Sequence, residues 1–110
     1  MHQIDWRQLA ADFNPDTHSI IDGQAYTPKS DNLLTKYSPV DNRSLQPVLL
    51  CNQLDVDIAV SNARQAFNDK RWRGKSINER KSILFKFAEL IDQHTQELAL
   101  MDALEMGKSV

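Results

Sequence analysis

The last third of the chain carries an apolar stripe at helical spacing. Ser76 and Glu79 form an S-x-x-E pattern, which predicts a capping box at a helix start. Gly107 is placed to adopt the left-handed conformation that ends many helices. Thr95 either divides the stretch into two helices near residues 93–95 or lies within one continuous helix. One face of the stretch consists of Ile83, Leu84, Phe87, Leu90, Ile91, His94, Leu98, Met101 and Leu104.

Two further helices are predicted upstream. The first starts at Asp5, which we expect to cap it, with Gln8 in the capping-box position three residues later. It ends at Asn14, because the residue before Pro15 is pushed out of the helical region. The second starts at Asp55 as its predicted N-cap and has apolar residues at helical spacing: Val56, Ala59, Val60, Ala63, Ala66 and Phe67.

Short strands are predicted between these two helices. Asp22-Gly23 is a strong two-residue hairpin signal, because a type I′ turn needs a positive φ at both central positions. A second strand is expected over 32–38 and a third over 45–51, joined by a turn at 40–44. Pro47 in the third strand favours an edge position, since it has no N–H for a sheet.

The predicted fold class of this chain is α+β, mainly helical with an N-terminal β-hairpin and short strands. Residues 1–18 are expected to form an N-terminal helix and turn, and residues 19–110 to form the strands and the remaining helices. A chain of 110 residues buries only about two-thirds of its unfolded surface. The apolar stripes therefore offer more surface than these residues can cover alone.

Charge and apolar content exclude several classes of protein. The formal net charge of −2 gives no general attraction to nucleic acid or to membranes. No apolar run reaches the roughly 20 residues that cross a bilayer, and the N-terminus lacks the pattern of a secretory signal. The lone Cys51 forms no internal disulfide, which agrees with a reducing compartment. We expect a cytoplasmic protein.

Candidate reactive residues are few. Cys51 ends a predicted strand, and such a cysteine is more often a packing residue than a nucleophile. His2 and His18 are expected in solvent, and His94 on the stripe or at a helix junction; none has metal-ligand spacing. The "GKS" at 107–109 lacks the upstream glycine of a phosphate loop, since Asp102 stands there, and it ends a helix instead of opening one.

A basic window covers residues 70–81. It holds six of the chain's 13 basic residues, with Trp72 in the middle, a combination that would suit phosphate contacts and base stacking. The alternative is a solvated link between helices whose Trp72 packs on the core. No basic face continues along 82–110, so we expect no nucleic-acid binding.

Several segments together resemble the N-terminal part of the aldehyde dehydrogenase superfamily. "IIDGQAY" resembles the first hairpin of that family, and "YSPVDNRSL" its "x-N-P-x-T-G-x" turn. "DVDIAVSNARQAF" is similar to a "DVDRAVxAARxAF" helix, and the stretch ending "LALMDALEMGKSV" to the helices ending in "GKP". The resemblance runs from about Ile20 to Val110, and it is closest to the branch acting on γ-glutamyl-γ-aminobutyraldehyde and related ω-amino aldehydes.

This resemblance implies an α/β parent enzyme, with residues 19–110 as the incomplete N-terminal part of its NAD(P)-binding domain. The family uses NAD or NADP, a catalytic cysteine and a glutamate base, all of which lie further along such chains. Cys51 does not match the catalytic motif, so no catalytic or cofactor-binding residue is expected here. Many members hold a monovalent cation, whose matching positions are Ser38, Pro39, Val40 and Glu105, with Val40 and Glu105 as the candidate ligands. Glu105 replaces the commoner Asp.

The expected function is therefore that of an N-terminal fragment of an NAD(P)-dependent aldehyde dehydrogenase that is inactive and binds no cofactor by itself. Its expected partners are the remainder of such a chain, or a second copy through the exposed helix faces. The alternative is a non-enzymatic helical module that binds a partner protein through the same stripe.

Overall fold

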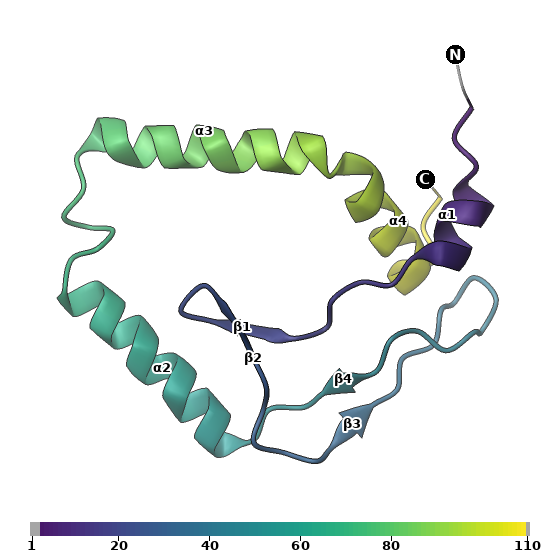
Figure 1. Cartoon of the computed structure of the whole chain (residues 1–110), viewed down its shortest axis with the longest axis horizontal. Helices are drawn as coiled ribbons and strands as arrows, with labels where there is room; N and C mark the ends of the chain where they lie inside the picture. Colours follow the sequence, from purple (N-terminus) through teal and green to yellow (C-terminus); the bar gives the residue numbers. More distant parts are fainter. Residues whose placement is uncertain (1–2, 110) are drawn as a thin grey trace.

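The computed structural model describes residues 3–109, so the expectations for His2 and Val110 lie outside the described residues. Figure 1 shows an open frame whose top, left and right sides are helices, with one pair of strands inside it and the other pair along its lower edge. The described part is mostly helical with short antiparallel strand pairs, which confirms the predicted α+β class. The elements are α1 (Trp6–Asp12), β1 (Ser19–Ile21), β2 (Gln24–Tyr26), β3 (Leu33–Leu34), β4 (Val48–Leu49), α2 (Gln53–Asn68), α3 (Ile77–Gln93) and α4 (Thr95–Met106).

Helix α1 begins as predicted, because the Asp5 carboxylate accepts hydrogen bonds from the backbone N–H groups of Arg7 and Gln8 at 3.1 Å. The Gln8 side chain does not complete a capping box. It donates to the Asp12 carboxylate at 2.8 Å instead.

The β1–β2 hairpin is confirmed, with φ of 56° at Asp22 and 73° at Gly23, as a type I′ turn requires. The other two strands are much shorter than predicted. β3 and β4 pair only through Leu33 with Leu49 and Leu34 with Val48, and they form a separate sheet. β4 begins at Val48, directly after Pro47, which has no N–H to donate to a sheet.

The predicted N-cap of α2 is wrong: the cap is Asn52, and Asp55 is the third residue of the helix. The Asn52 side chain accepts from the Asp55 N–H at 3.1 Å, and the Asp55 carboxylate accepts from the Asn52 N–H at 2.8 Å. Asn and Asp are both favoured caps, so the sequence alone did not decide between them.

The Asp55 carboxylate also joins the hairpin to α2. Asp55 is buried, and its Oδ1 accepts from the Tyr26 hydroxyl at 2.7 Å and from the Lys29 N–H at 2.8 Å. Burial alone would raise the pKa of Asp55, but the hydrogen bonds from Asn52, Tyr26 and Lys29 together lower it below its ordinary value. The hydrogen bond to Asp55 is the main cause that raises the pKa of Tyr26 to about 12.

These pKa shifts predict how a Tyr26→Phe variant depends on pH. Tyr26 binds its proton more tightly in the folded state, so its contribution to stability is complete below pH 10.0 and is lost as pH rises toward about 12. Asp55 has a lowered folded pKa, so its contribution is lost as pH falls below roughly 4. Denaturant unfolding should therefore show the variant less stable near neutral pH, with the gap closing at both extremes. A gap that is constant over this pH range would contradict the assigned hydrogen bond.

The long stretch at the C-terminal side forms two helices, which decides between the two alternatives. The capping box of Ser76 and Glu79 is present at the start of α3. His94 lies at the junction, and the Thr95 hydroxyl donates to the carbonyl of Asp92 at 2.9 Å, closing the end of α3. Gly107 ends α4 with a φ of 71°, as predicted.

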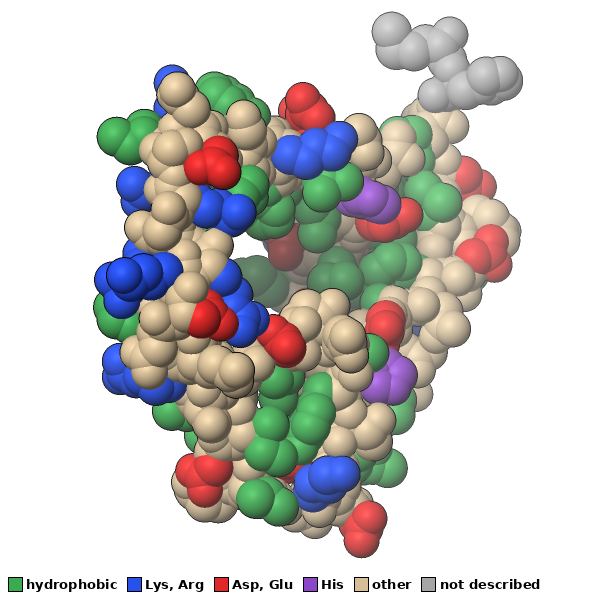
Figure 2. All heavy atoms as spheres, turned by 60° about the vertical axis from the view of Figure 1, so that its left-hand side comes forward, with side chains coloured by type: hydrophobic (Ala, Val, Ile, Leu, Met, Phe, Trp, Pro, Cys, Tyr) green, Lys and Arg blue, Asp and Glu red, His purple; other side chains and the backbone are tan. Residues whose placement is uncertain are grey.

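The apolar core of the described residues is small. Its buried hydrophobic members, Leu100, Ala103 and Leu104, all lie on α4, which packs against α1. The stripes of α2 and α3 lie open, with Val60 62% and Phe87 60% exposed. Figure 2 shows hydrophobic side chains around a hollow in the molecule and Lys and Arg side chains along its outer edge. No described helix is long and apolar enough to span a membrane.

The accessible surface measures how open this fold is. The chain exposes 8987 Å², whereas a compact monomer of its size exposes roughly 6,200 Å². Its radius of gyration is 17.9 Å, against about 13 Å for a compact domain of this length. The chain is therefore more open than a compact monomer, and the large apolar side chains of α2 and α3 are among those it exposes.

Candidate functional site

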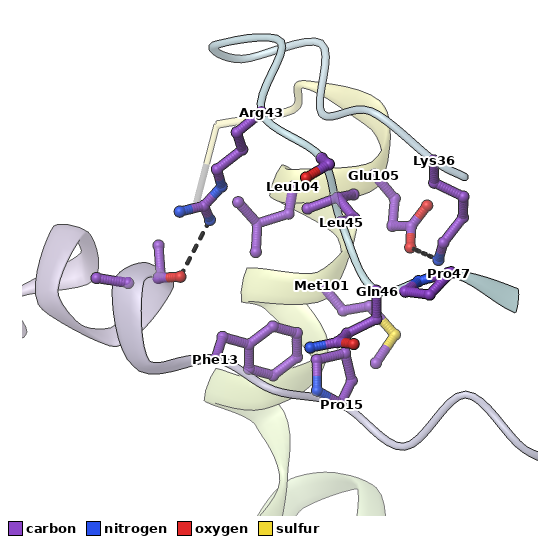
Figure 3. Close-up of a pocket in the computed structure, with 13 residues that line it drawn as sticks. Phe13, Pro15, Lys36, Arg43, Leu45, Gln46, Pro47, Met101, Leu104 and Glu105 are labelled. Carbon is purple, nitrogen blue, oxygen red and sulfur yellow. Dashed lines mark hydrogen bonds and ion pairs between the residues drawn. The ribbon is translucent and has the colours of Figure 1, made fainter.

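A pocket lies where α1, the loop before β4 and α4 meet (Figure 3). Its volume is about 360 Å³. Phe13 and Pro15 from the segment after α1 face Met101 and Leu104 of α4 across it. Its charged side chains are Lys36, Arg43 and Glu105.

Glu105 is the predicted cation ligand that lines this pocket. Its carboxylate forms an ion pair with the Lys36 ammonium, which joins the loop after β3 to the last turn of α4 (Figure 3). The Lys36 side chain is 26% exposed and the Glu105 side chain 38%. The other predicted ligand, Val40, lies in the turn between Tyr37 and Ser44 with an exposed side chain. A cation at Val40 and Glu105 stays a prediction.

The turn that carries Val40 is held by its own backbone and by Ser38. Ser38 is fully buried; its N–H donates to the Arg43 carbonyl at 2.9 Å, and its own carbonyl accepts from the Asn42 N–H at 2.8 Å. Pro39 sits against the end of α4, since a Cβ added at Gly107 would lie 3.2 Å from the Pro39 ring. The turn therefore rests directly on the helix end.

Arg43 ties the same turn to α1. Its Nη2 donates to the Ala10 carbonyl at 3.0 Å, as Figure 3 shows. Its Nε is buried without a hydrogen-bond partner among the described residues, with the Asp41 carboxylate 3.8 Å away. Sequence reasoning missed Lys36 and Arg43, because a charged residue on a polar turn gives no signal of its partner.

The remaining candidates lie apart from this pocket. Cys51 is exposed, with its Sγ 3.5 Å from the Ser19 hydroxyl, so the described residues do not pack around it and the expected packing role stays a prediction. Cys51 lies two residues beyond the end of β4, outside the short β3–β4 pair. His94 lies beside Glu97, with Nδ1 and Oε2 3.0 Å apart. His18 pairs with Asp16, whose pKa is lowered chiefly by the hydrogen bond from the His18 backbone N–H and also by the His18 ring.

The basic window forms the link from α2 to α3. Arg71 binds the carboxylates of Asp69 and Asp22, and these contacts raise the pKa of Arg71 and lower that of Asp69. Arg73 lies over the Phe67 ring, with its guanidinium carbon 4.7 Å from the ring centre. Part of the positive charge is thus engaged within the chain, as in a solvated link. Trp72 is 43% exposed, so the expected packing on the core is only partial.

Comparison with known proteins identifies the family. The sequence profile described as "Aldehyde dehydrogenase family" matches residues 26–110. The chain is 34% identical over 106 residues to the aminoacetaldehyde dehydrogenase of Pseudomonas aeruginosa, covering 96% of this chain and 21% of the relative. It is 31% identical over 110 residues to the NADP/NAD-dependent aldehyde dehydrogenase PuuC of Escherichia coli, covering 99% and 22%.

The fold is found in solved structures as well. The γ-glutamyl-γ-aminobutyraldehyde dehydrogenase of Burkholderia cenocepacia superposes with a TM-score of 0.87 at 34% identity, over 91% of this chain and 20% of that one. The chain thus spans about a fifth of the length of the relatives it matches. On the profile match and these identities, the chain belongs to the aldehyde dehydrogenase family.

Proposed function

We propose that this chain is the N-terminal portion of an NAD(P)-dependent aldehyde dehydrogenase that oxidises an amino aldehyde to the carboxylic acid. Two relatives support the substrate class, since their names give aminoacetaldehyde and γ-glutamyl-γ-aminobutyraldehyde. A third, named NADP/NAD-dependent, supports the cofactor class. The chain's part in this function is structural: it positions a strand and helix frame against the parts that carry the chemistry.

The observation that carries this proposal is the uncovered apolar surface of α2 and α3. The chain exposes roughly 2,800 Å² more than a compact monomer of its size. A standard protein interface buries only about 800 Å² on each partner. An excess this large suits continuous packing inside a larger domain better than docking of a small transient partner. The same surface would serve a helical interaction module, which is the competing function.

A chimaera tests the proposal. The matched fifth of the P. aeruginosa aminoacetaldehyde dehydrogenase is replaced by this chain, and NADH formation from NAD⁺ and aminoacetaldehyde is followed. We expect measurable turnover by the chimaera and none by the 110-residue chain alone or by the relative without its matched fifth. Turnover by the isolated chain would contradict the proposal, and so would a soluble, folded chimaera that is inactive.

A further inference from the structure

We propose that the Lys36 ammonium takes the place of a free monovalent cation beside Glu105 in this chain. The ion pair connects two segments 69 residues apart in sequence and fixes the loop after β3 on the last turn of α4. The proposal goes beyond the proposed activity, because it concerns which positive charge fixes the turn at 38–40 on α4.

The residues around Glu105 do not fit a free cation while Lys36 stays where it is. A monovalent cation would need the Glu105 carboxylate as its one charged ligand, and that carboxylate is already neutralised by an ammonium group in direct contact. A metal ion at the same carboxylate would be repelled by the Lys36 charge at short range. Lys36 is in effect a monovalent cation attached to the chain.

The side chains have the reach for this arrangement. Glu105 is one methylene longer than Asp, and Lys36 brings a flexible stem of four carbons from the loop. The Lys36 carbonyl accepts from the Leu45 N–H at 2.8 Å, so its backbone is fixed in the same turn that contains Ser38 and Asn42. The Lys36 ammonium is therefore attached to a backbone segment that is held by a hydrogen bond within the turn.

Hydrogen exchange of the 110-residue chain tests the proposal. The reporters are the Asn42 and Leu45 amides, which donate within this turn to the carbonyls of Ser38 and Lys36. Exchange is measured in sodium, potassium and choline chloride at equal ionic strength. We expect the wild-type rates to be the same in all three salts. In choline, Lys36→Gln should exchange roughly two- to fivefold faster, and sodium or potassium should restore the protection.

Two variants serve as controls. Lys36→Arg keeps the positive charge and should remain protected in choline. Lys86→Gln removes an exposed lysine whose partner is Glu89 on the same helix, and it should leave both reporter amides unchanged.

Three outcomes overturn the proposal. Wild-type amides that are better protected in sodium or potassium than in choline would show that a metal ion binds despite Lys36. Lys36→Gln rates equal to wild type would show that the ion pair does not hold the turn. A variant that exchanges faster in all three salts alike would show that Glu105 is no cation position. If Lys36→Gln loses its helical circular dichroism, the test is the wild-type protein alone: amides that are better protected in sodium or potassium than in choline overturn the proposal.

Discussion

Phe87→Glu should abolish most of the self-association that we expect of the isolated 110-residue chain. Phe87 is 60% exposed on the apolar stripe of α3, where a second copy or the rest of a parent enzyme would cover it. A carboxylate buried there without a partner opposes contact. Sedimentation velocity at micromolar concentrations should show dimers or larger species for wild type. The apparent association of the variant should be weaker by roughly tenfold or more.

Phe85→Glu is the matched control. Phe85 is equally large and 66% exposed, but it lies two residues away on the opposite side of α3 from the stripe. Its substitution should leave association unchanged in the isolated chain and activity unchanged in the chimaera, whereas Phe87→Glu should lower both. Equal effects of the two substitutions, or a wild-type chain that is monomeric throughout, would refute the assignment of this face.

Asp55→Ala should separate the β1–β2 hairpin from α2. The substitution leaves three donors without their acceptor: the Tyr26 hydroxyl and the backbone N–H groups of Lys29 and Asn52. It also removes half of the capping box at the start of α2. Because unmet buried donors are costly, hydrogen exchange at the Lys29 and Asn52 amides should be roughly 10- to 100-fold faster.

Asp57→Ala provides the control on the same helix. Asp57 accepts a hydrogen bond from the Gln53 side chain at 2.8 Å on the exposed surface, so its loss should leave the two reporter amides protected. The helix content of α3 and α4 should be retained in both variants, because Asp55 does not contact them. Unchanged exchange in Asp55→Ala would show that the hairpin is held on α2 by other contacts.

Local sequence signals predicted the elements that depend on near neighbours. The Asp22-Gly23 turn, the Ser76 and Glu79 capping box and the Gly107 helix end each depend on a few consecutive residues, and each is confirmed. The same reasoning failed at α2, where Asn52 and Asp55 offer equivalent caps. It also overestimated β3 and β4, because strand length depends on a partner strand that the local pattern does not contain.

The candidate site was only half accessible from the sequence. Glu105 and Val40 were named through family resemblance, but their surroundings were not. The structure alone shows that Lys36 pairs with Glu105 and that Arg43 donates to the Ala10 carbonyl while its Nε has no hydrogen-bond partner among the described residues. These contacts form only where α1, the turn and α4 come together.

By itself, the sequence determined where the helical stretches lie, the capping box of α3, the Gly107 end of α4, the hairpin and the family, because helical periodicity and turn chemistry act over a few residues. Only the tertiary structure decided that Asp55 holds the hairpin and that Lys36 meets Glu105. It alone showed that the faces of α2 and α3 stay uncovered. Those facts depend on contacts between segments tens of residues apart, and no local pattern encodes which distant group a charge or an apolar face will meet.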